Sequence, residues 1–570
     1  MNTHFIKFSF QSRIRIVVIL TLLSCFVSCK KKPVGRITDN AMVVSARIEA
    51  SKIGSDILKQ GGNAFDAMIA TQFALAVAYP YAGNISGGGF MVYRDKDGNV
   101  GGLDFREKAP LTATHDMYLD SLGNFIPGKS TEGATAVGVP GSVSGVFAVH
   151  QKFGSLPMET LIQPAIDLAK QGLIVTEKQE ERIKKYQEKI IEISGKQTLF
   201  ANDFKRGDTI KYHALARTLQ AIKENGQDGF YKGETAETLV RFLQECGGII
   251  TLEDLAKYQS VWREPVIFQY DELKVISMAP PSSGGITLAQ IMKMIEPYDL
   301  RKMNHNSVES IHVITEAERR AYADRNYFLG DPDFADIPSE TLLDSLYLLD
   351  RMDSFSLEKA TSSESISHGK IEIVESMETT HFSIVDSLGN AVSVTTTLNG
   401  AYGSKLYCDE LGFFLNNEMD DFSAKPGVPN MFGLVGAEAN AIAPEKRMLS
   451  SMTPTIVEKD GELWMVVGTP GGSTIITSVL QTILNVHEYD MGMQEAVNRP
   501  RFHHQHLPDE IRMEPGVFPE RVVKKLKEKG HTINEERTPV IGKVNAILVL
   551  PDGRLEAGAD PRGDEAAVGY

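Results

Sequence analysis

Short apolar strands alternate with turn-rich stretches around the middle of the second half of the chain. Residues 382–385 form an apolar run, 386–390 read Asp-Ser-Leu-Gly-Asn, and 391–396 are rich in Val and Thr. This pattern predicts a β-hairpin with Thr379 and Thr380 at its mouth. A Thr pair there is by itself typical of a strand edge, because a threonine hydroxyl is a weak nucleophile without a base.

Apolar positions at helical spacing occur on both sides of this hairpin. Residues 44–59 predict an amphipathic helix, and Asn63 is the predicted N-cap of an Ala-rich helix to about residue 78. Residues 310–328 predict a long helix whose charged side chains form intrahelical pairs. Residues 472–487 predict another helix, so helices flank a strand-rich middle in each half.

A glycine-rich run at 86–89 stands before a predicted strand at 90–93, and residues 100–104 predict the returning strand. A dinucleotide-binding loop opens a helix instead, so close backbone packing in a sheet is the better interpretation. Residues 353–376 are polar and Ser-rich, and they predict a flexible segment leading to Thr379.

The net charge of the chain limits the kinds of molecule that it is expected to bind. The chain has 570 residues, a formal net charge of −15 and a pI near 5.5. Its length allows a large core or several domains. The acidic balance argues against nucleic acid, because no surplus of basic side chains is available to neutralise phosphates.

Residues 1–29 have the pattern of an export signal. Basic residues precede an apolar run at 16–27, which has signal-peptide length and is short for a membrane-spanning helix. The run leads to Cys29 and three lysines, as in bacterial lipoprotein signals. Cys25 is a competing lipidation site, and an ordinary secretory signal is the alternative. The sequence predicts an exported lipoprotein, anchored to a membrane on the periplasmic or cell-surface side.

Cysteine and histidine spacing predicts no metal site. The chain has no C-x-x-C pair and no H-E-x-x-H motif. Cys246 and Cys408 follow the signal, one on each side of Thr379, and they specify no pairing.

Four strings, in order along the chain, carry a family resemblance: Thr379-Thr380-His381, Asn416-Asn417-Glu418-Met419-Asp420-Asp421-Phe422, Leu449-Ser450-Ser451-Met452 and Gly468-Thr469-Pro470-Gly471-Gly472-Ser473. With them the chain resembles the γ-glutamyltranspeptidases (glutathione hydrolases), which are N-terminal nucleophile hydrolases, from about Asp39 to Tyr570. The family has a string matching the histidines at 503–506 without a metal, so these are predicted to be structural.

The resemblance implies an α+β fold, the four-layer αββα sandwich, formed jointly by two subunits cut from one precursor. The cut is expected between Glu378 and Thr379. It divides the mature chain into a large subunit, 30–378, and a small catalytic subunit, 379–570, which form a heterodimer. No cofactor is implied.

The resemblance also assigns roles to residues. Thr379 is the nucleophile, supported by Thr397, and the backbone N–H groups of Gly471 and Gly472 stabilise the oxyanion. A γ-glutamyl head is held at its α-carboxylate by Arg106, Ser450 and Ser451, and at its α-amine by Asn399, Glu418 and Asp421. These residue types suit the task, since a guanidinium pairs a carboxylate through two bonds and carboxylates accept from an ammonium.

Phe432 matches a lid position that is commonly aromatic with a hydroxyl. Phenylalanine covers a site but forms no hydrogen bond across it. The predicted activity is γ-glutamyl transfer from glutathione and related compounds to water, an amino acid or a peptide. Two alternatives are an acylase acting on glutaryl amides, whose substrates lack the α-amine, and an inactive surface lipoprotein that binds peptides.

Overall fold

The computed structural model of the protein describes residues 34–367, 379–425, 431, 436–536 and 540–570. Two seven-stranded antiparallel sheets form its centre. The first runs in the order β1 (Ile37–Thr38), β20 (Leu555–Ala559), β19 (Asn545–Val549), β15 (Glu462–Gly468), β14 (Thr455–Lys459), β9 (Leu273–Ser277), β8 (Val266–Tyr270). The second runs β21 (Ala566–Gly569), β2 (Met42–Ser45), β10 (Thr380–Val385), β11 (Ala391–Thr397), β3 (Gly88–Arg94), β4 (Val100–Asp104), β7 (Val261–Arg263).

The sheets pack face to face through a buried apolar layer. Phe90 and Val92 of β3 belong to one cluster with Ile276 of β9, Ile456 of β14 and Ile547 of β19. Side chains alternate between the two faces of a strand, so the opposite face of each sheet is left for helices.

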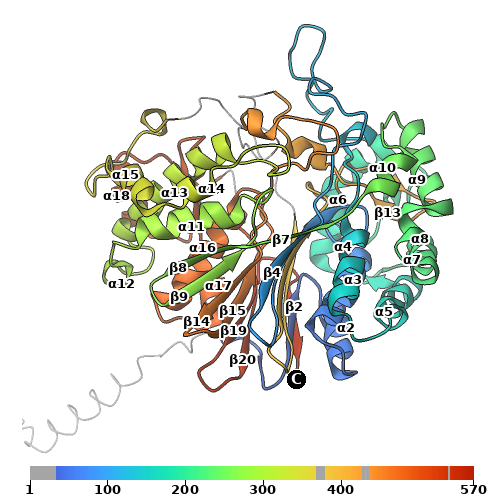
Figure 1. The fold of residues 1–570 in the computed structure, drawn as a ribbon, viewed down its shortest axis with the longest axis horizontal. Coiled ribbons are helices and arrows are strands. Elements are labelled where there is room, and N and C mark those ends of the chain that lie inside the picture. The colour runs from blue at the N-terminus through green and yellow to red at the C-terminus, as the bar shows by residue number, and fades with distance from the viewer. Residues whose placement is uncertain (1–33, 368–378, 426–430, 432–435, 537–539) are drawn as a thin grey trace, which may run out of the picture.

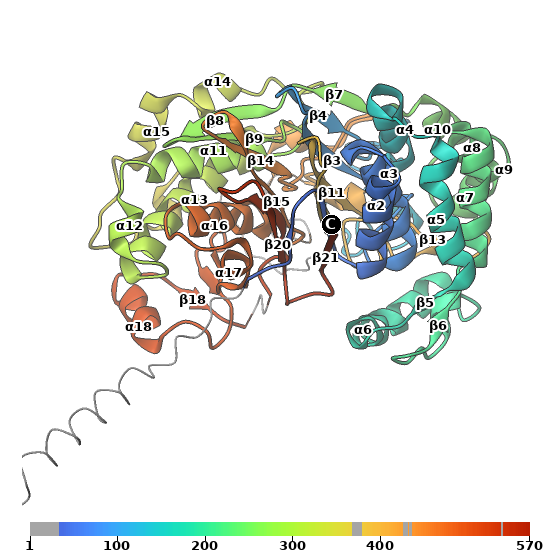
Figure 2. The same cartoon turned by 90° about the horizontal axis from the view of Figure 1, so that it is seen from below.

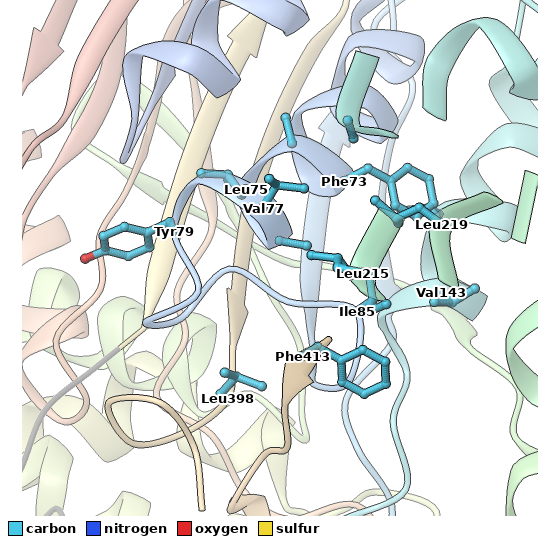
Figure 3. Packing of buried hydrophobic residues seen from close by; sticks show 14 of the residues in the cluster. Phe73, Leu75, Val77, Tyr79, Ile85, Val143, Leu215, Leu219, Leu398 and Phe413 are labelled. Atoms are coloured by element: carbon cyan, nitrogen blue, oxygen red, sulfur yellow. The ribbon is translucent and has the colours of Figure 1, made fainter. Parts of the chain in front are cut away.

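Helices cover both outer faces (Figures 1 and 2). The second sheet carries α2 (Ile48–Lys59), α3 (Ala64–Ala78) and α4 (Ser142–Phe153), and beyond them lie α5 (Met158–Gln171), α6 (Glu177–Ser194), α7 (His213–Asn225), α8 (Asp228–Tyr231), α9 (Gly233–Glu245) and α10 (Leu252–Lys257). Figure 3 shows part of the cluster that joins these helices to the sheet, with Phe73 from α3 and Leu219 from α7.

The first sheet is covered by α11 (Gly284–Ile295), α13 (Val308–Phe328), α16 (Thr474–His487) and α17 (Met493–Asn498), with α12 (Leu300–Met303), α14 (Ser339–Leu342), α15 (Ser345–Met352) and α18 (Glu520–Glu528) around them. The four layers are therefore helix, sheet, sheet and helix. This is the predicted αββα sandwich. None of the described helices has the length and apolar character needed to cross a membrane.

Local chemistry explains the hairpin of β10 and β11. The N–H groups of Leu388 and Asn390 donate to Asp386 Oδ1, at 2.9 and 3.0 Å, and these bonds close the turn. Gly389 has a φ of 88° within the turn. The strands then pair from Val385↔Ala391 to Thr380↔Thr396. The predicted hairpin is confirmed, and Thr379 lies immediately before its first strand.

Both sheets mix strands from the two sides of residue 379. In the second sheet β10 lies between β2 and β11, and β11 pairs with β3. In the first sheet β14 pairs with β9. A chain cut at that point would still share two continuous sheets, so its two parts would stay together.

The sequence prediction for the first helix was wrong in part. The helix expected over 44–59 begins at Ile48, because Met42–Ser45 is a strand between β10 and β21, partners that lie hundreds of residues away. The segment expected to be flexible, 353–376, is described as far as Ser367: most of that part is exposed, whereas Ser363 and Ile366 are buried and the Ser363 N–H donates to Asp509 at 2.8 Å. Cys246 is exposed, Cys408 is buried, and neither forms a disulfide.

Candidate active site

A cavity opens where the residue before β10, the end of β11, the start of α16 and the loops after β4 and β13 (Phe413–Phe414) meet. Eight of the residues predicted from the sequence line it: Arg106, Thr379, Thr397, Asn399, Asp421, Ser450, Ser451 and Gly472. Two others, Glu418 and Gly471, lie directly behind these lining residues. Residues from across the sequence therefore converge on one site.

Thr379 and Thr397 lie at neighbouring strand ends: Thr379 comes just before β10, and Thr397 is the last residue of β11. The pairing of Thr380 with Thr396 brings the beginning of β10 beside the end of β11. Thr397 Oγ1 accepts a hydrogen bond from the Asn399 N–H at 2.7 Å. Asn399 has a φ of 72°, a left-handed conformation that a non-glycine residue adopts only at a cost, and this bond helps to hold it.

Arg106 is a buried cation held by two acids. It follows β4, its Nη1 lies 2.6 Å from Glu418 Oε2, and its Nη2 lies 2.5 Å from Asp421 Oδ2. The guanidinium also donates to the carbonyl oxygens of Met448 and Leu449, both at 3.3 Å. A planar fork with this many fixed acceptors has one orientation, which a lysine ammonium would not keep.

Three carboxylates surround this one guanidinium. Glu107 lies 3.6 Å from Arg106, in addition to Glu418 and Asp421. Burial, reinforced by the other two acids, raises the pKa of Glu418 well above its usual range, although Arg106 opposes the shift. Burial likewise raises the pKa of Asp421. The floor of the cavity therefore holds more acids than cations, and the raised pKa of Glu418 favours its protonated form until an incoming ammonium adds a positive charge.

The serine pair sits on a supporting loop. Ser283 donates from Oγ to the Ser450 carbonyl at 2.7 Å, and Ser451 Oγ accepts from Arg325 Nη2 at 3.0 Å. Arg325 lines the cavity too, from the last turn of α13, and burial lowers its pKa to about 10. The sequence analysis missed Arg325, because no spacing along that helix distinguishes it from the residues that form intrahelical pairs.

Gly471 and Gly472 form the turn between β15 and α16. Their φ values are 144° and 54°, both in the region that favours glycine. A side chain at Gly471 would place its Cβ 2.6 Å from Thr474 Oγ1. The turn thus brings backbone to the cavity at the positive end of α16, where N–H groups favour negative charge.

Other predicted positions lie elsewhere. Glu378, Phe432 and Cys29 fall outside the described residues. The histidines of 503–506 are buried and hydrogen-bonded to neighbouring protein groups; His503 Nε2, for example, lies 2.9 Å from Gln505 Oε1. Two groups of ligand-type side chains, His312–Glu316–His531 and Asp271–Glu272–His487, come together in the described part of the chain, and neither lines the cavity.

The comparison with known sequences decides the family. The profile described as Gamma-glutamyltranspeptidase matches residues 50–570. The chain belongs to the γ-glutamyltranspeptidase family. Similar relatives in this family include the glutathione hydrolase proenzyme of Escherichia coli, 44% identical over 99% of this chain and 100% of the relative. The glutathione hydrolase proenzyme of Pseudomonas sp. (strain A14) is 48% identical over 87% of each chain.

The fold is shared with a solved acylase as well. The crystal structure of cephalosporin acylase from Bacillus halodurans superposes with a TM-score of 0.84, at 25% identity, over 96% of this chain and 98% of that one. The γ-glutamyltranspeptidase family and this acylase thus use one architecture, and the residues of the cavity must separate their substrates.

Proposed function

We propose that this chain is a γ-glutamyltransferase and glutathione hydrolase that first cuts itself before Thr379. The observation that carries the proposal is the placement of Thr379 in one cavity with Arg106 and Asp421. A nucleophile, a carboxylate-binding guanidinium and an ammonium-binding carboxylate are the three groups that a γ-glutamyl substrate requires. No cofactor enters the reaction.

Self-cleavage creates the catalyst. Thr379 Oγ1 attacks the carbonyl carbon of Glu378, its proton passes to the amide nitrogen, and the peptide bond is replaced by an ester. Water then hydrolyses the ester, leaving a carboxylate on Glu378 and a free α-amine on Thr379. The unperturbed pKa of such an amine is about 7.7–8.0, so its neutral form is available near neutral pH as the base for the neighbouring hydroxyl.

Turnover repeats this chemistry on the substrate. Thr379 Oγ1 attacks the γ-carbonyl of glutathione, the amine leaves, and a γ-glutamyl ester remains. Water or an acceptor amine then attacks the ester and frees the hydroxyl. The N–H groups of Gly471 and Gly472 are the proposed donors to the oxyanion; losing one such donor typically costs on the order of 10²–10³ in rate.

Recognition follows from the charge pattern of the floor. The substrate α-carboxylate binds the guanidinium of Arg106, with the hydroxyls of Ser450 and Ser451 as further donors. The substrate α-ammonium binds the carboxylate of Asp421, with Glu418 and Asn399 beside it. Binding of the zwitterionic head thus replaces the Arg106–Asp421 ion pair by two others, Arg106 with the α-carboxylate and Asp421 with the α-ammonium. No buried charge is left unpaired.

Thr397 supports the nucleophile from the adjacent strand end, where its hydroxyl already holds the turn to Asn399. Phe432 is the proposed lid residue. Without a hydroxyl, it would cover the cavity by packing alone.

The mature protein is proposed to be a heterodimer of 30–378 and 379–570. The sharing of both sheets between the two parts supports this, since β10 and β11 pair with strands from the other side of the cut. Residues 1–29 are the proposed signal, with Cys29 as the lipidated residue and Cys25 as its competitor. Such an anchor would hold the enzyme on the periplasmic or cell-surface side of a membrane.

A glutaryl acylase is the competing function, given the structural likeness to cephalosporin acylase. Its substrates would bring a carboxylate to Arg106 but no ammonium to Asp421 and Glu418, in a site that already has more acids than cations. An inactive peptide-binding lipoprotein is disfavoured by the presence of Thr379, Thr397 and the two glycines together.

Two matched substrates test the proposal. γ-Glutamyl anilide and glutaryl anilide differ only by the α-amine, so their kcat/KM ratio measures its recognition. We expect at least a tenfold preference for the γ-glutamyl compound, and faster aniline release with glycylglycine as acceptor. Equal or better turnover of the glutaryl compound would contradict the proposal and favour the acylase.

A further inference from the structure

The cavity contains a second buried arginine, which takes no part in the steps proposed for Thr379. Arg325 lies in the last turn of α13, is 3% exposed, and lines the same cavity as Arg106 and Thr379. Two guanidinium groups therefore reach one substrate cavity. Their surroundings differ, because Arg106 is paired with acids and Arg325 is not.

Arg325 bonds only neutral groups among the described residues. Its Nε donates to Ser283 Oγ at 3.0 Å, its Nη1 to Asn326 Oδ1 at 3.1 Å, and its Nη2 to Ser451 Oγ at 3.0 Å. Burial lowers its pKa to about 10, although Asp421 opposes the shift without pairing with it. A buried cation without a paired acid does little to stabilise a fold, so its place in the cavity points to a role in binding.

The bond from Arg325 sets the direction of the Ser451 hydroxyl. A guanidinium donates and never accepts, so Ser451 Oγ is the acceptor of this bond and its own proton points away from Arg325. Ser451 lines the cavity, and within the described part of the chain its hydroxyl donates to no protein group. The proton is therefore available to an acceptor in the cavity, and the cation behind it strengthens the hydroxyl as a donor.

The neighbouring serine is oriented in the same sense without Arg325. Ser450 Oγ accepts from the Met452 N–H at 3.1 Å. The Ser450 carbonyl accepts from both the N–H and the hydroxyl of Ser283, each at 2.7 Å. Both serine hydroxyls thus accept from the protein and can donate into the cavity, but only Ser451 depends on Arg325 for this.

We infer that Arg325 is a positioning residue of the α-carboxylate site, which turns the Ser451 hydroxyl toward the substrate and strengthens it as a donor. This inference rests on the proposed function, in which Arg106 contacts the carboxylate directly and Arg325 acts through Ser451. The α-carboxylate keeps its charge throughout the reaction, so Arg325 would stabilise the bound substrate and the transition state alike. Its loss should raise KM and leave kcat nearly unchanged.

Two substitutions remove the donor to Ser451 in different ways. Arg325→Met removes every donor and the charge while it keeps an extended side chain. Arg325→Gln places an amide N–H near the position of the arginine Nε, so it keeps a donor for Ser283 and loses the donor for Ser451. No described acid pairs with Arg325, so neither change strands a buried carboxylate, and we expect two normal bands on a denaturing gel for both variants.

The kinetic test is a double-mutant cycle with γ-glutamyl anilide at a fixed glycylglycine concentration. Losing a hydrogen bond to a charged group typically costs about tenfold or more in binding. We therefore expect each Arg325 variant to lower kcat/KM about tenfold through KM, with kcat within about threefold. In the Ser451→Ala background the same changes should cost less than about threefold, because the hydroxyl that they act on is absent. Ser450→Ala is the matched control, and there the loss should stay about tenfold.

The outcomes separate this inference from the proposed function. Normal KM in the cut Arg325→Met and Arg325→Gln enzymes would overturn the inference. So would an undiminished loss in the Ser451→Ala background, a fall in kcat without a rise in KM, or two uncut variants, since Arg325 would then act on the fold or on the chemistry. The proposed function would survive all of these results, and it fails if the wild-type chain stays uncut or prefers the glutaryl anilide.

Discussion

Replacing Arg106 by Lys tests the recognition site most sharply, because it keeps the charge and removes the fork. The guanidinium bonds Glu418 and Asp421 through different nitrogens, at 2.6 and 2.5 Å. One ammonium on a shorter stem cannot keep both while presenting two donors to a substrate carboxylate.

The magnitude follows from the bonds that are lost. A charge-assisted hydrogen bond contributes about 1.5–3 kcal/mol. At about 1.36 kcal/mol per decade, the loss of one such bond lowers kcat/KM about tenfold to 150-fold. Self-cleavage should survive, because the peptide before Thr379 offers no free α-carboxylate to this residue.

The assay combines a denaturing gel with γ-glutamyl anilide kinetics. Arg263→Lys is a matched control: Arg263 also forks onto two acids, Asp104 at 2.8 Å and Asp333 at 2.7 Å, but does not line the cavity. We expect two normal bands for both variants and impaired kcat/KM for Arg106→Lys alone. If Arg106→Lys is cut and turns over normally, the carboxylate is bound elsewhere; if it stays uncut, Arg106 is structural.

Three further predictions concern the nucleophile, pH and location. Thr397→Val should lower kcat at least tenfold in a folded, cut enzyme, because the hydroxyl that holds the Asn399 N–H is lost; unchanged kcat would remove Thr397 from the site. Burial lowers the pKa of His381 to about 3, and that of His504 to about 3, so these side chains stay neutral when folded while the unfolded chain takes up protons below about pH 6.5. The free energy of unfolding should therefore decrease as the pH drops from 6.5 toward 3, by about 1.4 kcal/mol per pH unit for each of the two histidines. His381→Asn should make this decrease with pH less steep, as measured by denaturant unfolding. Cys29→Ser should release activity to the soluble fraction; release by Cys25→Ser instead would move the lipidation site.

Sequence reasoning succeeded where structure is set locally. The hairpin of β10 and β11 depends on an Asp-to-Asn turn within the same few residues, and the helix from Ala64 depends on its Asn63 cap, whose side chain accepts from the Phe65 and Asp66 N–H groups at 2.9 Å. The eight predicted residues that line the cavity came from motifs quoted for the family rather than from their spacing.

Sequence reasoning failed where the structure of a residue depends on partners that are far away in the sequence. Met42–Ser45 has apolar residues that continue into a helical pattern, and only its pairing with β10 and β21 makes it a strand. Arg325 reaches the cavity because α13 packs against α11, and Ser363 is buried because Arg319, His506 and Asp509 bond to it. No local pattern in a polar stretch could have revealed these contacts.

The central claim is that the chain makes its own nucleophile at Thr379. N-terminal sequencing of the smaller band from the purified protein tests it directly, with Thr379→Ala as the companion variant. The account predicts a sequence beginning Thr-Thr-His at residue 379, and one uncut chain for Thr379→Ala. A small band that begins at any other residue, or a Thr379→Ala chain that is still cut, would contradict it.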